Sequence, residues 1–133
     1  MVFAGKIISI ARKLQFLLAL SIYCFFALVP NPQAYVRIQY SDLFLHGLGN
    51  FLLVLSTWLV IAGRNKPWIV IVVAIPFSLL VELAQGFTSQ RTVDYRDMIA
   101  NLVGIFIGYV VSVILQKIYN AYLLEHVNHR KEI

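Results

Sequence analysis

The segment WIVIVVAIPFSLLVELAQGFTSQRTVDYRDMIANLVGIFIGYVVSVIL, residues 68–115, consists of two strongly apolar runs joined by a short polar stretch. Glu82 and Asn101 lie inside the apolar runs rather than in the polar stretch between them. At about 1.5 Å per helical residue, each run approaches the roughly 30 Å of a bilayer's hydrocarbon core. The segment therefore predicts two membrane helices that run antiparallel and hold polar side chains within their length.

The composition of the whole chain agrees with a membrane location. Of the 133 residues, 60% are hydrophobic and 13% are charged, and the mean hydropathy is +0.79. A soluble surface needs more charge than this. The formal net charge of +5 does not indicate nucleic acid, because the basic residues are dispersed and no aromatic stacking platform accompanies them. Membrane lipids are the expected partner.

We predict an all-α integral membrane protein with one domain, residues 1–133, and four transmembrane helices. The spans are expected at 7–29, 43–62, 68–87 and 98–115, followed by a cytoplasmic tail at 116–133. The first run also resembles a secretory signal peptide with a basic head. A retained helix is favoured over that alternative, because Ala34 is the one small residue suited to cleavage and Pro32 occupies the other key position.

The distribution of lysine and arginine predicts the orientation of the spans. Eight basic residues fall on the side of the two termini and three on the opposite side. Both termini are therefore expected in the cytoplasm, and the polar stretch after span three is expected to face outward. Trp58 and Trp68 flank the tight turn at 63–67 and are expected to anchor it at the inner interface.

Polar residues of three spans are predicted to lie at one depth. With this topology His46, Glu82 and Asn101 each sit about 6–8 Å below the outer boundary. Asp42 and Asn50 share the helix face of His46, and Ser78 and Gln85 share the face of Glu82. We expect these faces to point into the bundle. The candidate binding set is His46, Glu82, Gln85, Arg91, Asp94, Arg96, Asp97 and Asn101.

Each candidate also has a structural alternative. Asp94 and Asp97 have the spacing of a helix cap. Glu82 with Arg91 or Arg96 would form a structural ion pair. A lone histidine such as His46 is more often a packing residue. The remaining histidines, His126 and His129, lie in the basic tail without further ligands, so no metal site and no cofactor is assigned. Cys24 is expected to pack as an apolar side chain.

Small residues recur at every fourth position of the last span. They are Ala100, Gly104, Gly108 and Ser112. Such a stripe allows close approach of two membrane helices. A partner helix within the same chain is favoured, and a homodimer is the alternative.

The motif ExxQ at 82–85, followed by Arg91, Asp94, Asp97 and Asn101, resembles the VanZ-like family. The segment SDLFLHGLGNFLL, residues 41–53, is similar to that family's second-helix signature, although Leu43 and Asn50 depart from it. The resemblance covers residues 40–110. It implies a small protein of the bacterial cytoplasmic membrane, related to a protein linked to teicoplanin resistance, without an established reaction.

Three functions remain open from the sequence. The first is an envelope protein whose outward polar pocket binds a lipid or a lipid-linked glycan headgroup. The second is an enzyme acting on such a lipid, with Glu82 or His46 as general base and Arg91 stabilising charge. The third is a structural or assembly subunit. Binding ranks above catalysis, because the chain contains no catalytic triad order, zinc motif or phosphate-binding loop.

Overall fold

The computed structural model describes residues 2–29, 35, 42–87 and 94–129. Within these residues the protein is helical, with α1 at Val2–Leu28, α2 at Asp42–Ile61, α3 at Ile69–Gln85 and α4 at Tyr95–His129. The all-α prediction is confirmed for this part of the chain. Residues 30–34, 36–41 and 88–93, which hold the predicted outer connections, lie outside the described residues.

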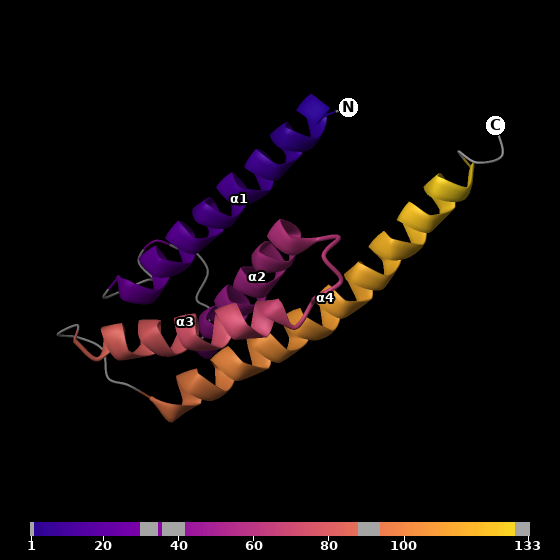
Figure 1. The fold of residues 1–133 in the computed structure, drawn as a ribbon. Coiled ribbons are helices and arrows are strands. Elements are labelled where there is room, and N and C mark those ends of the chain that lie inside the picture. The colour runs from indigo at the N-terminus through magenta and orange to yellow at the C-terminus, as the bar shows by residue number, and fades with distance from the viewer. Residues whose placement is uncertain (1, 30–34, 36–41, 88–93, 130–133) are drawn as a thin grey trace.

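In Figure 1 the axes of α1, α2 and α4 are roughly parallel, while α3 crosses them at an angle. The N-terminus of α1 and the C-terminus of α4 lie at the same end of the molecule (Figure 1). At the opposite end α1 and α3 finish and α2 and α4 begin. This arrangement brings the start of α2, the finish of α3 and the start of α4 to one end of the bundle.

Local chemistry explains where the helices begin and end. The connection between α2 and α3 turns through Gly63, with a φ of 92°, and Asn65, with a φ of 53°. Both are residue types that tolerate the left-handed region. Asp94 precedes α4, and its Oδ1 accepts a hydrogen bond of 2.9 Å from the backbone N–H of Arg96. This is the contact of an N-cap, so the capping alternative for Asp94 is what the structure shows.

Close contact between α2 and α4 holds the centre of the fold together. A Cβ atom at Gly104 would overlap the backbone carbonyl of Gly47, and one at Gly108 would lie 2.8 Å from Cβ of Val54. Ser112, farther along the same stripe, is fully buried at 0% exposure. The small-residue face of α4 thus packs on a helix of its own chain.

The core lies between α2, α3 and α4. Its buried apolar side chains are Leu53, Val54, Trp58, Ile61, Val70, Ala74 and Ile105. Large apolar side chains elsewhere point outward along α1, α3 and α4, including Leu18, Leu80 and Phe106, which are 63%, 64% and 67% exposed. Such a surface suits a lipid environment and not water.

Among the described residues, three helical stretches are long and apolar enough to cross a membrane: Gly5–Leu28, Asp42–Ile61 and Tyr95–Leu124. The helix α3 is apolar but has 17 residues, fewer than the 20 predicted for this span. The helix α4 runs to His129, past the predicted end of its span at 115, because no proline or glycine interrupts the sequence there.

The two tryptophans near the α2–α3 connection differ in environment. Trp68 is 54% exposed, as a membrane-interface anchor would be. Trp58 is 8% exposed, and its indole N–H donates a 3.2 Å hydrogen bond to Oε1 of Gln116. The prediction that Trp58 is an interface anchor is therefore wrong. Its polar atom finds a partner on α4, which draws the whole ring inward.

Candidate functional site

Polar side chains are buried at the end of the bundle where α2 and α4 begin. His46, Asn50, Glu82 and Asn101 are 7%, 0%, 3% and 4% exposed, and they come from three different helices. Buried polar groups are costly unless they find partners. The packing of the three helices therefore brings these side chains together, where they can serve as partners for one another. We refer to the four residues as the polar cluster.

A continuous set of contacts connects the polar cluster. Nδ2 of Asn50, which has two hydrogens to donate, has three acceptors within reach: the backbone carbonyl of His46 at 3.1 Å, the Tyr23 hydroxyl at 2.9 Å and Oδ1 of Asn101 at 2.6 Å. Nδ1 of His46 lies 3.2 Å from the same Asn101 oxygen. Nδ2 of Asn101 donates to Oε2 of Glu82 at 3.4 Å. Asn101 thus links the polar side chains of α2 with Glu82 of α3.

Two aspartates border the cluster on the side of the helix starts. Nε2 of His46 lies 3.6 Å from Oδ2 of Asp97, which is the second residue after the start of α4. Asp42, the first residue of α2, joins this pair, and one ligand atom from each of the three residues lies within 4.8 Å of the others. Asp42 is exposed and Asp97 is half-buried, so this side of the cluster faces outward from the bundle.

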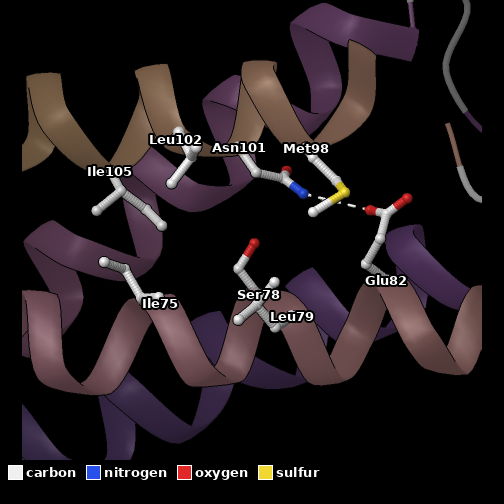
Figure 2. Close-up of a pocket in the computed structure, with 8 residues that line it drawn as sticks. All are labelled: Ile75, Ser78, Leu79, Glu82, Met98, Asn101, Leu102 and Ile105. Atoms are coloured by element: carbon white, nitrogen blue, oxygen red, sulfur yellow. Dashed lines mark hydrogen bonds between the residues drawn. The ribbon is translucent and has the colours of Figure 1, made fainter. Parts of the chain in front are cut away.

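The polar cluster also borders a small pocket between α3 and α4. The pocket has a volume of about 50 Å³, room for a few water molecules. Figure 2 shows Ser78, Glu82 and Asn101 around it together with apolar side chains of both helices. The apolar lining residues are Ile75, Leu79, Met98, Leu102 and Ile105. Leu79 and Leu102 are 46% and 54% exposed, so they form a rim on the apolar outer surface.

Two oxygens of the polar cluster are buried without a hydrogen-bond partner among the described residues, Oδ1 of Asn50 and Oε1 of Glu82. Oε2 of Glu82 accepts the long bond from Asn101, whereas Oε1 accepts no bond from the described residues. An ionised carboxylate can accept several hydrogen bonds. This oxygen is therefore an open acceptor on a residue that lines the pocket.

The remaining predicted residues lie in other places. Gln85 is buried, and its Nε2 donates to the Ala27 carbonyl at 2.7 Å, which connects the ends of α3 and α1. Arg96 is exposed, and its guanidinium carbon lies 5.9 Å from the centre of the Tyr95 ring. Arg96 is therefore not part of the polar cluster. Arg91 lies outside the described residues.

Two residues of the network were not among the predicted candidates. Asn50 lies on the helix face predicted to point inward but is not in the candidate set, although an asparagine at the centre of an apolar run is itself a signal. Tyr23 is 9% exposed and contributes its hydroxyl from α1. Its sequence signal is weak, because tyrosine is common in membrane helices and its partner lies on another element.

Comparison with known proteins gives one result. The model of a protein family described as VanZ/LLP1 matches residues 7–116, well over half of the chain. Neither the curated proteins nor the solved structures contain a match to this chain. The matched range includes the whole polar cluster, both bordering aspartates and the small-residue stripe of α4.

Proposed function

This chain belongs to the VanZ/LLP1 family, and from that premise we propose that it is a bacterial membrane protein whose polar cluster binds the headgroup of a lipid or of a lipid-linked envelope precursor. The observation that carries the proposal is the open acceptor, Oε1 of Glu82, on a residue that lines a pocket. Intramembrane carboxylates of this kind commonly mark binding sites.

The shape of the pocket supports an amphiphilic ligand. Its floor contains Ser78, Glu82 and Asn101, and its rim contains exposed leucines on the apolar outer surface. A ligand entering from the lipid would pass apolar side chains before its polar part reached the carboxylate. The volume of about 50 Å³ admits one polar branch and no whole sugar. The matching group is a hydroxyl or an ammonium, because both donate hydrogen bonds to a carboxylate.

We also propose that the chain crosses the cytoplasmic membrane four times with both termini in the cytoplasm. The shared end of the two termini (Figure 1) and the bias of basic residues toward that side support this topology. The polar cluster then lies near the outer surface, where envelope precursors are used. An effect on susceptibility to glycopeptides such as teicoplanin would follow from binding such a precursor.

Binding to the protein in nanodiscs tests the proposal. Leu102→Trp should block the rim, and Glu82→Gln should remove the charged acceptor. We expect each variant to weaken binding of a lipid-linked envelope precursor by about tenfold or more. For Glu82→Gln this magnitude follows because a hydrogen bond to a charged group contributes about 1.5–3 kcal/mol. Ile99→Trp is the matched control, since Ile99 is 55% exposed on the same helix and does not line the pocket.

Precursor binding by these three variants can either support or refute the headgroup site. Equal binding by parent, Leu102→Trp and Glu82→Gln would refute a headgroup site at this pocket. Loss of binding in Ile99→Trp to the same degree as in Leu102→Trp would show that added bulk on α4, and not occupation of the pocket, is responsible.

A further inference from the structure

We propose that Asp42, His46 and Asp97 form a binding site for a divalent transition-metal ion, with zinc as the best-matched example. The three residues each place a ligand atom within 4.8 Å of the others. Asp42 and His46 are four residues apart on α2 and therefore share a face. Asp97 approaches from α4, so the set joins two helices.

The surrounding hydrogen bonds determine which nitrogen of His46 is protonated. A backbone carbonyl can only accept, so the contact to the His46 carbonyl identifies Nδ2 of Asn50 as the donor. That amide group also donates to Oδ1 of Asn101, while the Asn101 amide donates to the Glu82 carboxylate. Both contacts indicate that the Asn101 amide places its oxygen toward His46 and its nitrogen toward Glu82.

Nδ1 of His46 must then donate its proton to the Asn101 oxygen, because that oxygen is only an acceptor. In neutral imidazole the other nitrogen, Nε2, carries a lone pair. This lone pair faces the carboxylate of Asp97. Metal-binding histidines have the same pattern, in which one nitrogen donates to an oxygen and the other binds the ion. Asn101 would be the residue that orients the imidazole.

The distance between the two ligand atoms fits a shared ion. Nε2 of His46 and Oδ2 of Asp97 are 3.6 Å apart, longer than a good N–H···O hydrogen bond. Two ligands that each lie about 2.1 Å from a tetrahedral zinc ion are about 3.4 Å from each other. The pair is therefore spaced for an ion between the two atoms rather than for a direct bond.

The ligand types restrict the identity of the ion. One imidazole and two carboxylates suit zinc and similar transition metals, whereas magnesium and calcium prefer oxygen ligands alone. Three protein ligands would leave a coordination position open. The exposed Asp42 gives this position access from outside the bundle.

The unsatisfied Glu82 is an independent observation that favours a cation here. It is 3% exposed, and Oε1 lacks a hydrogen-bond partner among the described residues. It forms no ion pair with a described lysine or arginine. A buried carboxylate is expensive unless a positive charge lies nearby, and a divalent ion at the adjacent site would supply that charge.

Equilibrium dialysis against zinc and cobalt tests this proposal on the full chain without a polyhistidine tag. The chain contains three histidines, so the background variant His126→Ala with His129→Ala leaves His46 as the sole histidine. We expect this background variant to bind one ion per chain and to melt several degrees higher with zinc. Bound cobalt should give the visible absorption of a tetrahedral or five-coordinate site.

Substitution of the ligands should weaken zinc binding at least tenfold. Asp42→Asn is the principal variant, because Asp42 is exposed and asparagine keeps its size; Asp97→Asn is the second. Asp94→Asn is the matched control at the same end of α4, since asparagine caps a helix as well as aspartate. It should bind zinc like the background.

If His46 and Asp97 formed only an ion pair, the chain would not bind zinc at this place and the ligand substitutions would not change its zinc affinity. Absence of saturable binding by the background variant would overturn the metal site, as would unchanged affinity in both Asp42→Asn and Asp97→Asn. The test is separate from that of the headgroup site. Glu82→Gln keeps all three ligands and should still bind one zinc ion per chain, more weakly because a nearby negative charge is lost, whereas its lipid binding should fall by about tenfold or more.

Discussion

Adding a single methyl group at Gly104 should destabilise the protein. In Gly104→Ala the new Cβ would overlap the backbone carbonyl of Gly47 on α2. A backbone carbonyl cannot rotate away as a flexible side chain does, so α2 and α4 must separate. This separation would also stretch the contacts of Asn101 with His46 and Asn50, which cross the same interface.

The expected magnitude follows from two opposing effects. Overpacking a tight contact costs about 1–3 kcal/mol, and the backbone partner places this case at the upper end. Alanine gains about 0.5–1 kcal/mol over glycine in helix propensity. The net loss in unfolding free energy should therefore be about 2 kcal/mol. Gly104→Leu should cost more, because it adds a full side chain to the same face.

The assay is thermal or denaturant unfolding in detergent with two matched controls. Gly5→Ala adds the same methyl group to α1 at a position with nothing within 4 Å, and it should be neutral or slightly stabilising. Val103→Leu adds bulk next to Gly104 at a residue that is 51% exposed, and it should also be nearly neutral. If Gly104→Ala unfolds like Gly5→Ala, or Gly104→Leu like Val103→Leu, the close approach of α2 and α4 is not as described.

Three further predictions concern the cluster, the opposite end of the bundle and the topology. Glu82→Gln should fold at least as well as the parent in detergent melting, because it removes a buried charge that lacks a full set of partners; a fall in stability parallel to the loss of binding would favour a structural role. Trp58→Phe should lose about 1–3 kcal/mol of stability, since it leaves a buried glutamine oxygen without its donor, whereas Trp68→Phe should change it by less than about 0.5 kcal/mol; equal effects would contradict the inward placement of Trp58. Reporter fusions at Gln33 and Gln90 should indicate an external location, and a cytoplasmic signal at both would overturn the proposed topology.

The sequence by itself determined the class of protein, the helices and the family. Apolar runs of about 20 residues have few alternatives to helices in a membrane, because every backbone polar group must be satisfied internally. The shared helix face of Asp42 and His46, and the places of Glu82 near the end of one helix and Asn101 near the start of the next, also follow from the sequence and helix geometry alone. For this reason His46, Glu82, Asp97 and Asn101, which the structure brings together at one end, are in the predicted candidate set, whereas Asn50 is not.

Tertiary structure decided which partners these residues find. Periodicity defines the faces of a helix, but the rotation of each helix about its axis is set by packing, here by the contact of Gly104 with Gly47. The rotation of α3 directs Gln85 toward α1. The rotation of α2 turns Trp58 inward. It also brings the first residue of α2 beside Asp97 on α4, a meeting of residues far apart in sequence that no local pattern could predict.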